Sequence, residues 1–597
     1  MQKILLDCQT NNLDEFRMAA ELAKDCGMTH VLVSQIEKSM WQWNKDRYDP
    51  YPNWGMGQTT LFKIVVPEAL KKYLPSDYAE RNLETIIKRV EILKEYGLSA
   101  ALKSTEPSWL PLEVYAEHPS WRGPRCDQPR RARKEYYSPC TDNPEVAALY
   151  DEAVYKLCSV AQIELFDFLT NDSGGGLCWS ERLYPGANGP SRCHHISTAD
   201  RAVNFLNVIQ NAAARAGINA EVGYTRFFLE SEKAAIVSKL NENQFCCGAR
   251  KDGSFVNKRV GFISNTLTDP HNPTVPVNGI PLVVKIATDM QQTAGDTESN
   301  IFYVLPTIQQ KEYNQFLRLA TGKIKNSTSS RYEILKQTAV SIIGETWADK
   351  LLDVWENIDT VQKKLVHLNQ GGHMFTLGTV HQRWLTRPLV AFPNELTNQE
   401  KSYYREFIFQ AESEKEADNL LNLQATYWLS GHSARGLLMK CTLSAMEELD
   451  KAISILKELL SQPELEAHYD YLSELLLKLR MYVCVIKNAQ NVVQFQSILD
   501  RTDYEAELKD TSVANDEQGD VRLYKILNIV RAEIDNSYEM IGILDQAKTP
   551  VLLVTESEES EDIMTLGPDV KNDLYKKIEI MEKHRYDFNR LYKCTNM

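Results

Sequence analysis

The chain has 597 residues, of which 43% are hydrophobic and 25% are charged, and its formal net charge is -14. This length exceeds what one hydrophobic core supports and the composition is ordinary for a globular protein, so a single small module and a wholly disordered chain are both excluded. The negative charge opposes binding to nucleic acid or to an anionic membrane, and neither is expected as a partner.

The chain carries no run close to the roughly 20 apolar residues that span a bilayer. Residues 1–7 lead directly into a strand-like pattern, without the apolar core of a signal peptide. As written, the sequence predicts a cytoplasmic protein, or a periplasmic or secreted one if a leader has been removed. It predicts no oligomeric state.

Short apolar runs alternate with longer amphipathic segments over the first 430 residues. Strands are predicted at residues 4–7, 30–34, 98–103, 162–170 and 219–225, and helices at residues 13–25, 77–95, 144–160 and 198–216. Further strand-like runs follow at residues 260–264, 282–287 and 301–305, although the first two also fit an inserted hairpin. The alternation predicts an α/β fold, a (β/α)8 TIM barrel, over residues 1–430.

The remainder of the chain changes character. Apolar residues recur at spacings of three and four, as in Leu472, Leu476, Leu479 and Val483. This spacing predicts a mostly α-helical domain over residues 431–597.

In a barrel of this kind, reacting groups follow the carboxyl ends of the strands. The polar and aromatic residues at those places are Asp7, Glu106, Trp109, Asn171, Asp172, Trp179, Arg226 and Glu230. Three glycines, Gly174 to Gly176, come shortly after Asp172 and permit close approach of the backbone to a ligand. The alternative interpretation of this segment is a turn that only redirects the chain.

Aromatic rings next to carboxyl groups are typical of a glycan cleft, and cleavage of a glycosidic bond ordinarily needs two carboxyl groups. The prediction assigns Asp172 as acid/base, Glu106 as its partner and Glu230 as a reserve, with the pKa of the acid raised by an apolar wall. The predicted substrate-binding residues are Asp7, Trp109, Arg122, Asn171, Trp179, Arg226, His381 and Arg383.

Twelve cysteines are too few for a disulfide scaffold. The group Cys178, Cys193, His194 and His195 raises a zinc hypothesis, but its spacing matches no closed zinc signature, so buried thiols or a local disulfide are favoured. No metal and no cofactor is therefore predicted. A metal-dependent hydrolase that uses Asp172 with this group stays open as an alternative.

Segments 118–124, 171–178 and 184–190, together with the helical tail, resemble bacterial glycoside hydrolases of the family 20-like and α-glucuronidase-like TIM-barrel group. The resemblance implies a TIM barrel with a carbohydrate-active role. Family 20 hexosaminidases carry an adjacent Asp-Glu pair after the fourth strand, whereas this chain has Asn171-Asp172 there. This departure puts the family 20 mechanism in doubt.

The sequence therefore predicts a glycoside hydrolase acting on an oligosaccharide or polysaccharide, with an acidic or N-acetylated glycan as the expected substrate. The alternative is a noncatalytic glycan-binding or scaffolding protein on a degenerate glycosidase barrel. Fold alone does not separate these two.

Overall fold

The computed structural model describes residues 3–591 apart from residues 9, 11, 37–57, 128–134, 173, 185, 255–257, 261–276, 297–298, 306–309, 367–383, 408–431, 500–515, 555–557, 559–560 and 562–565. Contacts divide the chain into two compact units. The sheet unit comprises residues 1–264 and 285–334, and the helical unit comprises residues 265–284 and 335–597. The domain boundary predicted at residue 430 lies outside the described residues and stays a prediction.

The sheet unit is built on one sheet of eight strands in which every pairing is parallel. In chain order, the strands are β1 (Ile4–Cys8), β2 (His30–Leu32), β3 (Ser99–Thr105), β6 (Ile163–Leu169), β7 (Glu221–Arg226), β8 (Gln244–Cys246), β9 (Lys258–Val260) and β10 (Ile301–Leu305).

The spatial order of these strands is β8-β7-β6-β3-β2-β1-β10-β9. The first and last strands of the chain, β1 and β10, are thus neighbours, which is the cyclic order of a (β/α)8 barrel opened between β8 and β9. No pairing joins β8 to β9 within the described residues. The mixed α/β fold with a barrel-like parallel sheet is therefore confirmed, and closure of the barrel stays a prediction.

Helices follow most of these strands, as the alternating pattern predicted. They are α1 (Leu13–Asp25), α3 (Ser76–Tyr96), α5 (Pro144–Val160), α6 (Thr198–Arg215), α7 (Glu230–Lys239), α8 (Val283–Thr293) and α9 (Lys311–Ala320). Local signals set their ends. Asn12 and Asn143 accept backbone N–H groups at the starts of α1 and α5, Ser197 does so for α6, and Gly97 ends α3 with a φ of 71°.

One predicted strand is wrong. The apolar run at residues 282–287 lies not in a strand but largely in α8. A short apolar run fits a buried strand and one turn of a buried helix equally well. The continuation of α8 through Asp289 to Thr293, amphipathic with helical spacing, decides for the helix.

An inserted hairpin lies between β3 and α5. It contains α4 (Leu112–Glu117) and the antiparallel pair β4 (Arg122–Arg125) and β5 (Tyr137–Pro139). Gly123 of β4 lies so close to β5 that a Cβ there would approach the Ser138 carbonyl oxygen to 2.6 Å. Only glycine permits this approach of the two strands.

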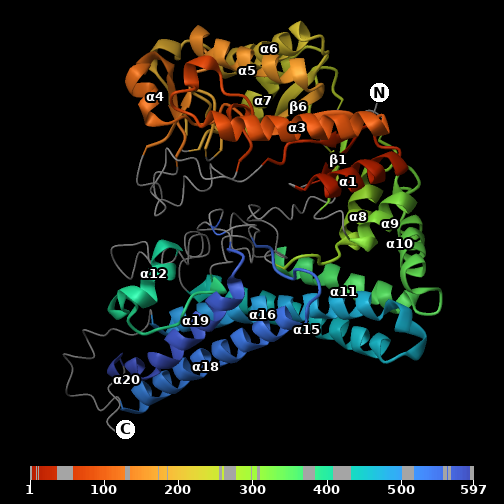
Figure 1. The fold of residues 1–597 in the computed structure, drawn as a ribbon, viewed down its shortest axis with the longest axis vertical. Helices are drawn as coiled ribbons and strands as arrows, with labels where there is room; N and C mark the ends of the chain where they lie inside the picture. The colour runs from red at the N-terminus through yellow and green to blue at the C-terminus, as the bar shows by residue number, and fades with distance from the viewer. Residues whose placement is uncertain are drawn as a thin grey trace. The chain divides into compact units, whose positions relative to one another are not determined.

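The helical unit contains long helices that pack in sequence order, each against the next. They are α11 (Ala348–Val366), α15 (His432–Leu460), α16 (Tyr469–Leu499), α18 (Asp516–Gln546) and α19 (Val570–Lys583). Figure 1 shows α15, α16 and α18 running side by side. The predicted helical character of the C-terminal part is thus confirmed for the described residues.

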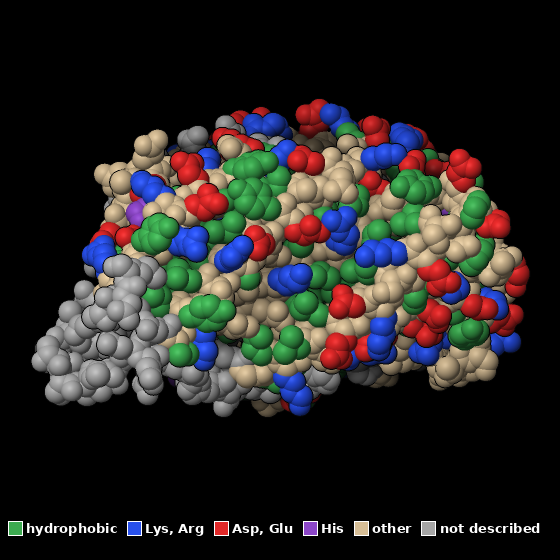
Figure 2. All heavy atoms as spheres, turned by 90° about the horizontal axis from the view of Figure 1, so that it is seen from below, with side chains coloured by type: hydrophobic (Ala, Val, Ile, Leu, Met, Phe, Trp, Pro, Cys, Tyr) green, Lys and Arg blue, Asp and Glu red, His purple; other side chains and the backbone are tan. Residues whose placement is uncertain are grey.

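No helix in the described parts of the chain is long and apolar enough to cross a bilayer. On the face drawn in Figure 2, basic and acidic side chains are interspersed rather than gathered by sign. This face therefore offers no basic patch of the kind that follows a phosphate backbone.

A buried ion pair lies inside the helical unit. Lys577 of α19 donates to Glu533 of α18, and both side chains have no exposed surface. Asn488 and Asn491 of α16 donate to the two carboxylate oxygens of Glu533, each at 2.7 Å. Lys577 also donates to the carbonyl oxygen of Leu385 at 2.8 Å. This cluster of hydrogen-bonded side chains therefore joins α16, α18, α19 and the segment that contains Leu385.

We expect Lys577→Met to destabilise the protein by about 3–5 kcal/mol, because it leaves the Glu533 carboxylate buried without its counter-charge. The free energy of unfolding in denaturant measures this loss. The matched control is Lys571→Met on the same helix, whose partner Asp545 is 52% exposed; an exposed pair contributes only about 0–1 kcal/mol. Equal effects of the two substitutions would contradict the assignment.

Candidate functional site

The interior of the sheet carries an apolar layer. Leu5, Leu32, Ala101, Leu165 and Phe302 come from five neighbouring strands and pack together, each at most 2% exposed. Side chains two residues apart on a strand point to the same face. The residues two positions further toward the carboxyl ends therefore face the mouth of the sheet.

Three of those positions are charged: Asp7 on β1, Lys103 on β3 and Asp167 on β6. Asp7 is 6% exposed and Asp167 is fully buried, while the ammonium group of Lys103 lies 3.9 Å from Asp7. Lys103 and Asp167 are direct partners in the β3–β6 register. Burying charge is costly, so a charged layer immediately above an apolar one marks the mouth of the sheet as the candidate site.

Sequence analysis selected Asp7 but missed Lys103 and Asp167. Both are charged residues inside apolar strand runs, in step with the buried positions Ala101 and Leu165. A charged residue two positions after a buried one, on the same face of an apolar strand, was the signal in the sequence that could have identified them.

Glu106 directly follows β3 and is completely buried. Its backbone N–H donates to the carbonyl oxygen of Leu169 at 2.9 Å, and its Oε1 accepts the backbone N–H of Leu61 at 2.6 Å. The hydroxyl groups of Ser104 and Tyr150 are polar neighbours of the carboxyl group. Burial raises the pKa of Glu106 to about 8, and the hydrogen bonds oppose this only in part.

Asp172 lies in the loop after β6 and is half-buried. Its backbone exchanges two hydrogen bonds with Gly175, at 3.1 and 3.2 Å. A Cβ on Gly175 would lie 2.4 Å from the carbonyl oxygen of Pro107, and Trp109 donates its backbone N–H to Gly174 at 2.9 Å. These glycines therefore permit close approach to the loop after β3, and approach to a ligand stays a prediction.

The adjacent Asn171 is 2% exposed and has a positive φ of 56°. Its Oδ1 accepts the backbone N–H of Leu177, while its Nδ2 donates to Ser180 Oγ and to the Phe227 carbonyl oxygen. All three bonds measure 2.8–3.0 Å. The amide of Asn171 is thus committed to holding the loops after β6 and β7 together.

The predicted aromatic residues lie partly in packing positions. Trp109 is 5% exposed and its ring meets Tyr136 edge-on at 5.5 Å. Trp179 is half-buried, donates its indole N–H to the Pro190 carbonyl oxygen and lies edge-on to His194. Trp179 thus keeps part of its surface accessible, whereas Trp109 is enclosed.

The predicted arginines and the reserve carboxylate are exposed or half-buried. Arg122 is exposed with its guanidinium 4.9 Å from the Tyr137 ring centre, and Arg226 is half-buried over the ring of Phe227. The Glu230 side chain is 90% exposed at the start of α7. His381 and Arg383 lie outside the described residues.

The structure therefore brings together the segments of Glu106 and Asp172, which a bridge between Ser108 and Gly175 joins directly. Arg226 is joined to the Asp172 segment by a hydrogen bond, in which the Thr170 backbone N–H donates to the Arg226 carbonyl oxygen at 2.9 Å. Glu230 does not join this group. Glu232, two residues further along α7, is buried instead. It accepts hydrogen bonds from Ser180 Oγ and from two backbone N–H groups.

No family model matches the chain, and no curated protein matches it. Solved structures similar to the chain include a GH138 enzyme targeting pectin rhamnogalacturonan II, at 9% identity over 99% of this chain and 84% of that one, with a TM-score of 0.48. An O-GlcNAc hydrolase of Thermobaculum terrenum is 9% identical over 98% and 96% of the two chains, with a TM-score of 0.35.

A GH20 β-N-acetylhexosaminidase from Streptomyces coelicolor A3(2) is 12% identical over 58% of this chain and 69% of that one, with a TM-score of 0.29. All three are glycoside hydrolases by these descriptions. Scores of this size place the chain in none of these families.

The buried Glu106 generates a prediction about pH. Its pKa is about 8 in the folded chain against an ordinary value of 4.5, so folding keeps a proton that the unfolded chain releases. The free energy of unfolding of the wild type therefore falls as pH rises from about 4.5 to about 8, by up to about 1.4 kcal/mol per pH unit. Above pH 8 this contribution does not change further. Glu106→Gln removes this penalty.

We expect the stability of Glu106→Gln relative to the wild type to increase between pH 5 and pH 8, as measured by denaturant unfolding at several pH values. The matched control is Glu230→Gln, which replaces a carboxylate that is 90% exposed and should leave the pH profile unchanged. Parallel pH profiles for the wild type and Glu106→Gln would show that Glu106 titrates normally.

Proposed function

We propose that the chain is a glycoside hydrolase that cleaves a glycosidic bond in a complex glycan at the carboxyl end of the parallel sheet. One observation carries the proposal: Asp7, Lys103 and Asp167 form a charged layer above an apolar one, next to the loop that holds Asp172. Carboxyl groups concentrated at this end of such a sheet are what acid/base cleavage of a glycoside requires.

Asp172 is the proposed proton donor. It is the half-buried carboxyl group of the site, on a loop fixed by hydrogen bonds to Gly175. Asp167 is the proposed second carboxyl group, because it lies on the strand that leads into the Asp172 loop and faces the mouth of the sheet. Asp7 and Lys103 would then bind sugar hydroxyl groups beside it.

Glu106 takes a different part in this proposal from the one the sequence suggested. The Oε1 atom of Glu106 accepts the Leu61 N–H, so this carboxyl group is engaged in holding the fold. We assign it as a positioning residue that holds the segment around Leu61 against the loops after β3 and β6. Glu230, exposed at the start of α7, stays outside the proposed machinery.

Trp179, Arg122 and Arg226 are the proposed sugar contacts on the rim, because each keeps exposed surface. An aromatic face suits the C–H surface of a pyranose, and a guanidinium suits the carboxylate of an acidic sugar. Trp109 is enclosed and would support the loop rather than touch the glycan.

A noncatalytic glycan-binding protein is the second candidate. The observation that favours it is Asn171, which stands where family 20 hexosaminidases carry a carboxylate and whose amide is fully engaged in loop hydrogen bonds. A screen of aryl glycosides that includes glucuronides and N-acetylhexosaminides separates the two candidates. Turnover identifies an enzyme, whereas glycan binding without turnover identifies a binder.

On the aryl glycoside that the screen identifies, Asp172→Asn should lower kcat by about 100-fold or more, since a positioned proton donor contributes at least that much. The backbone pairing with Gly175 involves no side-chain atom of residue 172, so the melting temperature should change little. Asp167→Asn should lower kcat as strongly as Asp172→Asn.

The control is Asp77→Asn, whose carboxylate is 78% exposed on α3 and should leave kcat unchanged. A stable Asp172→Asn variant with turnover near that of the wild type would remove Asp172 from the mechanism. Loss of turnover together with a large fall in melting temperature would assign it to the fold instead.

A further inference from the structure

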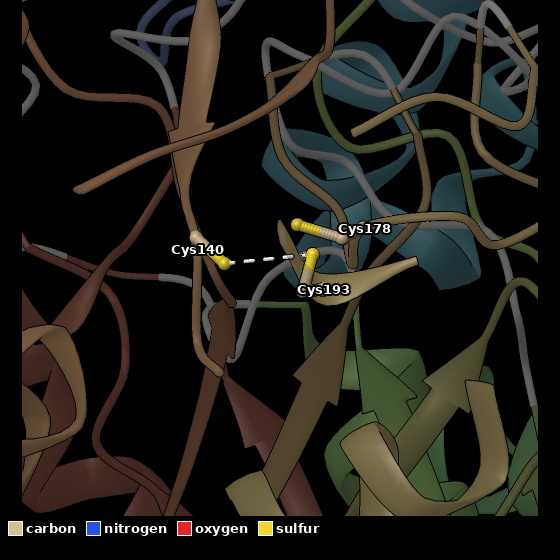
Figure 3. A group of neighbouring side chains, drawn as sticks. All are labelled: Cys140, Cys178 and Cys193. Atoms are coloured by element: carbon tan, nitrogen blue, oxygen red, sulfur yellow. Dashed lines mark hydrogen bonds between the residues drawn. The ribbon is translucent and has the colours of Figure 1, made fainter. Parts of the chain in front are cut away.

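Three cysteines from separate segments meet above the sheet. Cys140 follows β5, Cys178 lies in the loop after β6, and Cys193 ends a short 3-10 turn, Ser191–Cys193, before α6. Figure 3 shows their side chains pointing toward one another. The three sulfur atoms all lie within 4.8 Å of each other, and the three residues are 0%, 1% and 2% exposed.

The spacing of the sulfur atoms suits a metal better than a covalent bond. Cys140 Sγ lies 3.9 Å from Cys193 Sγ. Two thiolates bound to one tetrahedral zinc at about 2.3 Å stand about 3.8 Å apart, so this distance is close to one edge of the tetrahedron. A disulfide requires about 2.05 Å. Cys140, Cys178 and Cys193 are free thiols.

We propose that Cys140, Cys178 and Cys193 bind one Zn²⁺ through three thiolates. Thiolate sulfur is a common ligand of zinc in proteins. A third cysteine also distinguishes this cluster from a pair of thiols that could form a disulfide. Zinc in proteins is four-coordinate, so the three thiolates leave one position for a water molecule.

The surroundings hold the cluster in place. The fully buried guanidinium of Arg201, which pairs with Asp142, lies beside the cluster. Arg201 donates to the carbonyl oxygens of Cys178 and Cys193 and so orients the two segments that carry those sulfur atoms. Trp179 and Ile196, both partly buried, pack against the cluster.

Zinc bound here would link the inserted hairpin to the loop that carries Asp172 and to the turn before α6. The site rests on the sulfur geometry alone and stands whether or not the chain cleaves glycosides. Sequence analysis predicted no metal because the spacing of Cys178, Cys193, His194 and His195 matches no closed zinc signature. It left out Cys140, which only the fold of the hairpin brings to the other two.

The test is the zinc content of the full-length protein, expressed with zinc in the medium, purified under reducing conditions and measured by inductively coupled plasma mass spectrometry. We expect one zinc per chain in the wild type, and loss of that zinc in Cys140→Ser, Cys178→Ser and Cys193→Ser. Cys126→Ser is the matched control, because Cys126 is equally buried in the same hairpin but lies outside the cluster. It should retain the metal.

A measurement on the unmodified protein keeps the test decisive where a serine variant fails to fold. Replacement of zinc by Co²⁺ in the wild type should give the intense thiolate charge-transfer and visible bands of a tetrahedral sulfur site. A wild-type protein that holds no zinc and shows no such bands would overturn the proposal. So would mapping of a disulfide among Cys140, Cys178 and Cys193 in freshly purified protein.

Discussion

The loops of the candidate site depend on the burial of one positive charge, that of Arg201. This side chain on α6 has no exposed surface, so its guanidinium must find all its partners within the protein. It pairs with Asp142 at 2.5 Å and donates to carbonyl oxygens of Cys178, Cys193 and Ile196. The loop before α5, the loop after β6 and the turn before α6 are thus tied to one helix, and Asp172 lies on a loop held in this way.

Much of the sheet unit was predictable because its signals are local. Apolar runs of strand length placed β1, β3, β6, β7 and β10 within a residue or two, and capping residues such as Asn12 and Asn143 placed helix starts. The run at residues 282–287 failed because its length suits both element types, and only the helical spacing beyond it distinguishes them. No local signal in the sequence encodes closure between β8 and β9.

The candidate site was harder to predict because its members are set by register and by contacts between loops. The segments of Glu106 and Asp172 lie next to each other, but the sequence did not show that Glu106 is enclosed or that Glu230 faces solvent. Lys103 and Asp167 share the mouth of the sheet only because β3 and β6 pair in that register. Cys140 joins its two partners only through the folding of the hairpin.

The close contact between Gly175 and Pro107 has a consequence for the engineering of this protein. The loops that follow the strands of such sheets are usually treated as separate modules, each open to exchange without its neighbours. Here the loops after β3 and β6 share a bridge from Ser108 to Gly175 and a contact that admits no side chain. A grafted loop with any residue other than glycine at position 175 would place a Cβ 2.4 Å from the carbonyl oxygen of Pro107. The two loops therefore form one structural unit, and an exchange of loops would have to replace both together.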